Sequence, residues 1–204
     1  RLVGPSSVHG QGPTPLSVAA AFRLVAQQSP QRSPRSATEG GEGLETKWSV
    51  EPLQNGDVCI YFPAVKESSG LRFHVHAPFA STVARDSIRD DTGNVQLVAD
   101  LALLIAGALP ALCAEGLISD SLLAALPNED DQIVHPYTLI RDAVYEAFNS
   151  QSITPVWGST GGYAPARSLV SSPSEFRNWL DPSDLLELFR LVEIETDQFP
   201  RWIR

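Results

Sequence analysis

The sequence predicts an α+β domain in which helices pack on one face of a β-sheet. Apolar residues alternate or form short runs over residues 16–77, which is typical of strands, and recur at helical spacing after residue 94. A strand-rich half followed by a helix-rich half favours segregated elements over an alternating βαβ fold. The chain has 204 residues, 43% of them hydrophobic, which is enough to bury one sizeable core.

The strand-rich half begins after a segment rich in glycine and proline, residues 1–15, which is expected to be flexible. Residues 16–25 form a short apolar run and predict a buried strand. Residues 26–46 contain almost no large apolar residue, so they predict a mobile loop inserted between two strands. Residues 48–53 and 58–63 predict a hairpin, because the Asn-Gly dipeptide between them favours a type I′ turn.

Residues 71–77 have the clearest strand pattern. Alternate residues are apolar and predict the buried face, while the intervening residues are polar and predict the opposite face. The apolar set is Leu71, Phe73, Val75 and Ala77, and the polar set is Arg72, His74 and His76. Together with the preceding strands, this pattern predicts an antiparallel sheet within residues 16–93.

The helix-rich half, residues 94–204, is expected to pack on this sheet. Apolar residues at helical spacing predict a long core helix with Asn94 as its N-cap and Gly116 as its stop. Shorter helices are predicted at residues 119–126, 137–148 and 183–192, the last of them capped by Ser183. Short strands are predicted at residues 152–157 and 166–170, around a glycine-rich turn.

Charge and composition exclude several classes of function. The net charge of −9 disfavours non-specific binding to nucleic acid or to an anionic membrane. The apolar stretch 95–114 includes Gln96, Asp100 and Pro110, which fits a core helix better than a membrane span. The only two cysteines, Cys59 and Cys113, lie in apolar settings and are expected to be reduced. These features predict a cytoplasmic protein, and a chain without methionine is expected to be a piece of a longer one.

His74 and His76 form an H-x-H pair on one strand face, which suggests a shared metal ion. A further ligand is then needed, and only His9 and His135 remain among the histidines. Without a second metal-binding motif, hydrogen bonding to neighbouring residues is the favoured interpretation, and no metal is expected. The glycine-rich stretch 158–162 lacks the Lys-Ser/Thr of a P-loop, and it predicts a turn.

The polar stretch after the histidines holds the more specific candidates. If a helical turn starts near Val83, Ser81 or Thr82 caps it, and Arg85 and Arg89 share a face. Two guanidiniums beside free backbone amides suit a polyphosphate. The alternative is surface pairing of both arginines with Asp86, Asp90 and Asp91, and composition alone favours that alternative. No complete set of catalytic residues is evident.

A resemblance enters at "FPAVKESSGLRFHVHAPFASTVARDSIRDD", residues 62–91. This stretch resembles the segment after the nucleotide-binding domain in sacsin-like bacterial ATPases of the GHKL superfamily, relatives of the ninety-kilodalton heat-shock chaperones. The stretches "LLAALPNEDD", "YTLIRDAVYEAFNSQSITPV" and "GGYAPARSLVSSP" resemble its continuation, so the similarity covers about residues 16–204.

The resemblance implies a middle, or transducer, region. Its fold would be a mixed sheet backed by helices, with a left-handed, ribosomal-protein-like βαβ crossover and a helix-rich C-terminal part. In the chaperone relatives, an arginine after a polar loop reaches the ATP γ-phosphate held by the preceding domain. Arg85 occupies that position here, with Asp86 in place of a glutamate and Ala84 in place of a serine. Arg89 and Lys66 are the second and third choices for a contact with the nucleotide.

The nucleotide pocket of the superfamily is not part of this sequence. Its Glu-x-x-x-Asn helix, Asp-x-Gly-x-Gly turn and glycine-rich lid are not found. ATP and Mg²⁺ are therefore expected to bind mainly to an upstream domain of the same polypeptide, and this chain alone is predicted to be inactive. A protein client is a possible partner. The rival interpretation is a non-catalytic interaction module that binds a partner through the loop at 26–46 or through residues 170–192.

Overall fold

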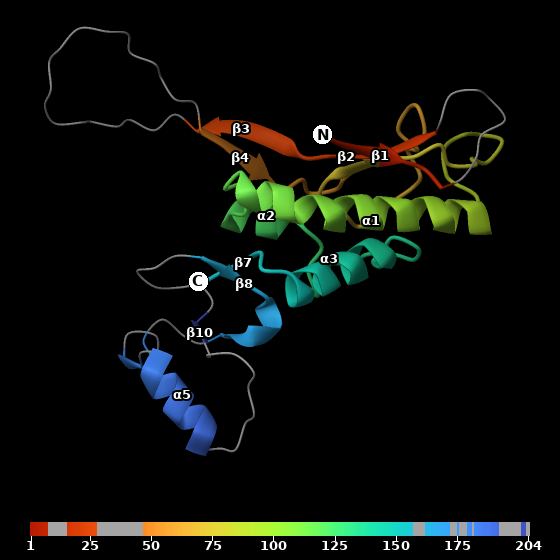
Figure 1. Ribbon diagram of the computed structural model, residues 1–204. Coiled ribbons are helices and arrows are strands. Elements are labelled where there is room, and N and C mark those ends of the chain that lie inside the picture. The colour runs from red at the N-terminus through yellow and green to blue at the C-terminus, as the bar shows by residue number, and fades with distance from the viewer. Residues whose placement is uncertain are drawn as a thin grey trace, which may run out of the picture.

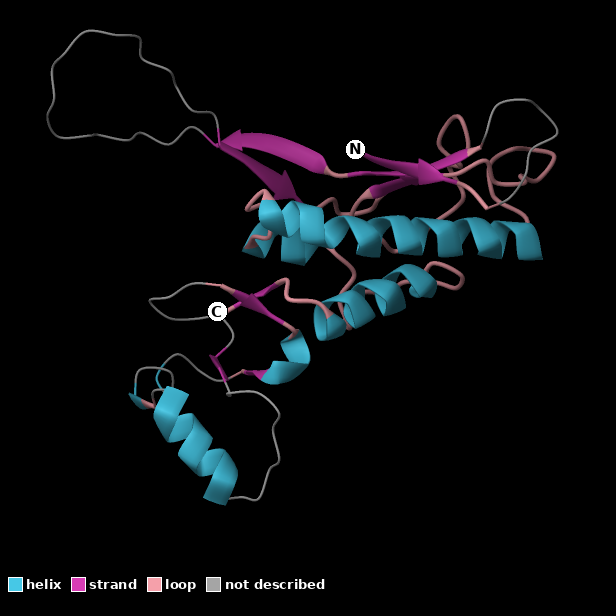
Figure 2. Cartoon of the chain, viewed as in Figure 1, coloured by secondary structure: helices cyan, strands magenta, loops and turns pink. Residues whose placement is uncertain are grey.

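The computed structural model describes residues 1–7, 16–27, 47–156, 162–171, 175, 179–180, 182–191 and 201–202. A β-sheet, the long helix α1 (Thr92–Ala114) and the helix α3 (Thr138–Ser150) are stacked as successive layers, so α1 lies between the sheet and α3 (Figure 1). Figure 2 shows the helices of this stack on one side of the strands. The predicted α+β class is therefore confirmed.

The main sheet has four strands in the order β1 (Leu2–Pro5), β2 (Ser17–Ala21), β6 (His74–His76) and β5 (Val58–Cys59). β1, β2 and β6 pair antiparallel, but β5 pairs parallel to β6. The sheet is therefore mixed, and the purely antiparallel arrangement expected from the strand pattern is wrong. The N-terminal segment 1–15, predicted as flexible, contributes the edge strand β1.

A second pair of strands extends from the end of β2. The predicted single strand at 16–25 is divided into β2 and β3 (Arg23–Gln27), and β3 pairs antiparallel with β4 (Lys47–Glu51). Phe22 lies at the division, and its ring stacks on that of Phe73 with the centroids 4.6 Å apart. This contact anchors the bend in the core. Of the loop predicted at 26–46, residues 26 and 27 belong to β3 instead, and the rest, like residues 8–15, lies outside the described residues.

The type I′ hairpin predicted at the Asn-Gly dipeptide does not form, because β4 pairs with β3 and β5 with β6. The turn instead runs along the segment before β6. The Leu53 N–H donates to the Arg72 carbonyl at 2.9 Å, and the Gly56 N–H donates to the Leu71 carbonyl at 2.7 Å. A Cβ at Gly56 would lie 1.9 Å from the Phe73 carbonyl oxygen. Glycine is thus needed here for close backbone approach rather than for the turn.

The alternation in residues 71–77 is confirmed, since Leu71, Phe73, Val75 and Ala77 are all buried and the residues between them are half-buried. Their side chains meet the apolar face of α1 in one continuous core. Both cysteines are free, Cys113 buried and Cys59 half-buried, as predicted.

The long core helix forms, but Asp91 is its N-cap and not Asn94. The Asp91 carboxylate accepts the Asn94 N–H at 3.0 Å. The predicted stop at Gly116 is confirmed. Gly116 has φ +68°, and the Leu117 N–H closes the helix end on the Leu112 carbonyl at 2.9 Å.

By length and composition α1 is also apolar enough to cross a membrane, the only such helix among the described residues. Its most apolar 18-residue window has a mean hydropathy of 2.2, and 44% of that window is buried. In this fold α1 packs against both the sheet and α3, which is the environment of a core helix.

The elements after α1 follow the prediction as far as α3. α2 (Asp120–Ala125) is capped by Ser119, and α3 buries Ile140 and Val144. Further on, β7 pairs with β8, and β9 pairs with β10. The helix α5 begins at Pro182, so Ser183 lies inside the helix and is not its N-cap. Of the strand predicted at 166–170, the first three residues form the 3₁₀ helix η1 instead. The bounds are β7 Thr154–Pro155, β8 Tyr163–Ala164, η1 Ala166–Ser168, β9 Leu169–Val170, α5 Pro182–Leu191 and β10 Arg201–Trp202.

Candidate functional site

Residues 80–89 form a polar hairpin between β6 and α1, called here the arginine hairpin. Ser81 and Ile88 form an isolated antiparallel bridge, the Thr82 N–H donates to the Ser87 carbonyl at 3.0 Å, and the Arg89 N–H donates to the Ala80 carbonyl at 2.9 Å. The helical turn predicted from Val83 is therefore absent, and neither Ser81 nor Thr82 caps a helix.

The hairpin separates its two arginines. Arg85 lies at the tip and Arg89 at the base, so the shared helical face predicted for them is wrong. Arg85 has φ +58° and is the only non-glycine residue with positive φ in the described part of the chain. A side chain in this region carries a conformational cost that the surrounding hydrogen bonds must offset. The Arg85 side chain is exposed, and no ion pair joins it to another described residue.

Lys66 holds the carboxylate next to Arg85. The Lys66 Nζ lies 2.6 Å from the Asp86 Oδ2, and the Lys66 N–H donates to the Asp86 carbonyl at 2.8 Å. The hydrogen bond between the two side chains raises the pKa of Lys66 and lowers the pKa of Asp86. The lysine that was the third choice for a nucleotide contact therefore binds the hairpin itself.

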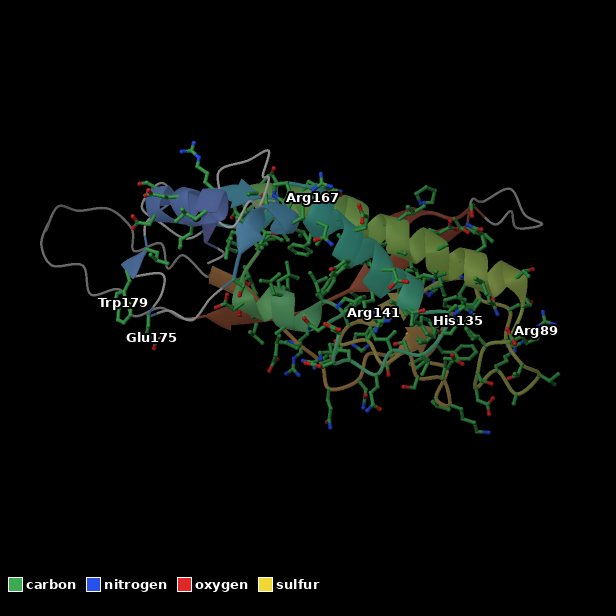
Figure 3. All side chains as sticks on the ribbon, turned by 90° about the horizontal axis from the view of Figure 1, so that it is seen from below. Arg89, His135, Arg141, Arg167, Glu175 and Trp179 are labelled. Carbon is green, nitrogen blue, oxygen red and sulfur yellow. The ribbon has the colours of Figure 1, made fainter. Side chains whose placement is uncertain are left out.

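Arg89 lines a small open cavity of about 210 Å³ that has both polar and apolar walls. Its guanidinium is 3.9 Å from the Asp91 carboxylate and its side chain is 60% exposed. Figure 3 shows Arg89 and His135 toward the end of the molecule away from Glu175 and Trp179. The residues lining the cavity are Glu67, Ile88, Arg89, Asp90, Asp91, Asn94, Val95, His135 and Pro136.

The Asn94 side chain hydrogen-bonds both strands of the arginine hairpin to the first turn of α1. Its side chain is 2% exposed. Oδ1 accepts the Ala80 N–H at 2.8 Å, and Nδ2 donates to the carbonyls of Ala80 and Arg89 at 2.9 and 2.7 Å. Sequence reasoning assigned Asn94 to the helix N-cap and missed this role. One feature of the sequence does point to this role. Asn94 stands near the start of a predicted helix, where an asparagine side chain readily hydrogen-bonds to backbone groups outside the helix.

Glu67 is a second anchor that the sequence did not reveal. Its Oε2 accepts the Ile88 N–H at 3.2 Å, and its Oε1 accepts the Tyr137 hydroxyl at 3.2 Å. Tyr137 is fully buried, and burial, with a smaller effect of the Glu67 charge, raises its pKa above the usual range. No pattern in the sequence connects residues 70 positions apart, so only the fold brings these groups together.

The two histidines of the H-x-H pair have separate surroundings. His74 Nδ1 accepts the Asp57 N–H at 3.0 Å and lies 3.2 Å from the Asp57 carboxylate. His76 lies edge-on to Tyr61, and burial lowers the pKa of His76. Within the described residues no group of three or more His, Cys, Asp or Glu side chains is arranged to hold a metal ion. His9 and residues 158–161 lie outside that part of the chain.

Comparison with known proteins adds no assignment, because no protein-family model, no curated protein and no solved structure matches the chain.

Proposed function

We propose that this chain is the transducer region of a GHKL-type ATPase, similar to the sacsin-like and chaperone ATPases, and that Arg85 contacts the γ-phosphate of ATP held by an upstream domain. The observation that supports this role is the position of Arg85. Its side chain is exposed at a hairpin tip and forms no ion pair with a described residue, whereas Arg89 and Lys66 face Asp91 and Asp86.

A guanidinium in this position suits the chemistry of phosphoryl transfer. It stays charged at any physiological pH and presents a planar array of donors to phosphate oxygens. A donor held in advance where negative charge develops lowers the barrier without reorganisation. Lys66 supports the role indirectly, because it pairs with the carboxylate of Asp86, the residue next to Arg85 in the chain.

The proposal extends to the setting of this contact. ATP and Mg²⁺ belong to the full-length protein, mainly to its upstream domain, and the protein is cytoplasmic. The left-handed crossover and the helix-rich C-terminal part of the transducer fold belong to the proposal too. The chain alone would not hydrolyse ATP, and its layers would convert the contact with nucleotide into domain motion, to which a protein client could respond.

The test is Arg85→Ala in the full-length protein, with Arg89→Ala as the matched control from the same hairpin. Loss of Arg85 should lower the rate of ATP hydrolysis by about 100-fold or more, because one preorganised donor to the transition state is removed. The affinity for ATP should change far less. The control should retain most of the activity. An unchanged rate in Arg85→Ala refutes the proposed role.

The second candidate is a non-catalytic interaction module, and a groove favours it. A groove of about 580 Å³ lies between α2 and α3, and most of its lining residues are apolar. Arg141, labelled in Figure 3, is one of its polar lining residues. Its apolar lining is Leu123, Leu126, Pro127, Val144, Tyr145 and Phe148. The sequence upstream of Arg1 separates the candidates: a GHKL pocket there supports the ATPase, and any other domain supports the interaction module.

A further inference from the structure

The arginine hairpin has two attachments to the helices, and they differ in kind. Asn94 joins the base of the hairpin directly to α1 through three hydrogen bonds. Glu67 joins the C-terminal strand of the hairpin to α3 through two hydrogen bonds that its carboxylate accepts, one from the Ile88 N–H and one from the Tyr137 hydroxyl. The first attachment fixes the hairpin in place, whereas the second connects it to a different layer of the fold.

The second attachment is a well-defined chemical contact. Tyr137 directly precedes α3, and its side chain is fully buried. Because burial holds its pKa above the usual range, the phenol keeps its proton and remains a donor. A carboxylate is a strong acceptor for that donor and for the Ile88 N–H, since hydrogen bonds to a charged group are stronger than neutral ones.

We propose that Glu67 and Tyr137 are positioning residues that couple the arginine hairpin to α3. This inference rests on the proposed function of Arg85. When Arg85 binds a phosphate, the hairpin strand that contains Ile88 shifts. Glu67 transmits this shift to Tyr137 and so to the first turn of α3. α3 packs along α1, so its displacement changes the contact between these two layers. Coupling of this kind requires a measured response at both ends.

The experiment compares hydrogen exchange of the full-length protein with Mg²⁺-ATP and with Mg²⁺-ADP. In the unaltered protein, the difference between the nucleotides should appear in the amides of residues 80–89 and of α3. Tyr137→Phe removes only the hydroxyl, so the difference in the hairpin should persist while the difference in α3 is lost. Tyr145→Phe is the matched control, because Tyr145 lies within α3 with 70% of its surface exposed, and it should retain both differences.

Kinetics provide a readout that a general loss of stability would not give. Tyr137→Phe should lower kcat by about 2- to 30-fold, the range for residues that modulate coupling between sites, while the KM for ATP stays nearly constant. Glu67→Met, which has neither acceptor, should have the same effect. Glu67→Gln should restore the response of α3, because its amide can accept from Ile88 and donate to the Tyr137 oxygen.

The outcomes separate this inference from the function on which it depends. If Arg85→Ala abolishes the nucleotide difference everywhere but Tyr137→Phe leaves the response of α3 intact, the coupling is wrong and the role of Arg85 stands. If Arg85→Ala changes nothing, both fail. Should Tyr137→Phe not fold, Glu67→Met decides, and a retained response of α3 in that variant overturns the coupling.

Discussion

Residues 71–79 and residues 80–89 are neighbours in the chain, yet different forces hold them. In the first segment alternate side chains, from Leu71 to Phe79, are buried in the apolar core. In the second, the tip is exposed, and the conformation depends on hydrogen bonds that backbone N–H groups donate to Asn94 and Glu67. The first segment is stabilised by area removed from water, and the second by individual polar atoms.

The difference explains how the fold can present a strained, charged residue. Burial alone has no direction and would not fix the backbone of Arg85 at φ +58°. Hydrogen bonds fix direction, but each contributes little net free energy, so they need a rigid support. The core segment supplies that support, and the hairpin supplies the geometry.

The largest expected effect tests the core side of this comparison. Phe73→Ala should lower the free energy of unfolding by about 3–5 kcal/mol, because a fully buried ring stacked on Phe22 is replaced by a cavity. Urea denaturation of the purified chain measures it. Tyr61→Ala is the control, since that ring is 81% exposed, and it should change the value by at most about 0.5 kcal/mol. Equal effects would mean that residues 71–79 are not core.

The next effect tests the polar side. Asn94→Ala should lower the free energy of unfolding by about 1–3 kcal/mol, because backbone groups of Ala80 and Arg89 lose a buried partner. Faster hydrogen exchange should be confined mainly to residues 80–89. Gln96→Ala, on the exposed side of the same helix, should leave both measurements nearly unchanged. Unaltered exchange of the hairpin amides in Asn94→Ala would show that other contacts hold the hairpin.

The smallest effect sharpens the comparison at alkaline pH. The pKa of Tyr137 is raised in the folded chain by burial and by Glu67, so its contribution to stability is fully present below about pH 10 and is lost as the pH rises further. At pH 11 this loss is about 1.4 kcal/mol relative to neutral pH. Thermal or urea unfolding at both pH values should show that Tyr137→Phe lacks this part of the loss. A Tyr145→Phe variant should keep this loss of stability. If the unaltered chain and both variants lose the same stability at pH 11, the Tyr137 phenol is not buried as described.

The sequence was most informative where a period is enforced by burial. The alternation from Leu71 to Ala77 predicted the buried face of that segment, and the helical spacing predicted the long helix α1, since each follows from backbone geometry alone. Gly116 likewise predicted the helix end, because few other residues adopt a positive φ at low cost. Arg85 was singled out from a short motif and a resemblance, and its role remains a prediction.

Predictions failed where a distant segment supplies the hydrogen-bond partners. The Asn-Gly dipeptide favours a type I′ hairpin locally, but the Leu53 and Gly56 N–H groups donate instead to the carbonyls of Arg72 and Leu71. Near Val83 a hairpin forms in place of the expected helical turn for a comparable reason. Asn94 and Glu67 supply hydrogen bonds to the hairpin that a local sequence pattern does not encode.

By itself, the sequence determined which residues leave water, because hydrophobic periodicity is a local property and the backbone has only a few regular geometries. Tertiary structure alone decided that Lys66, Glu67 and Asn94 bind one hairpin and that Tyr137 is joined to it through Glu67. Contacts between distant segments form only after loop closure, and many pairings of polar residues are nearly equal in free energy until the packed core selects one.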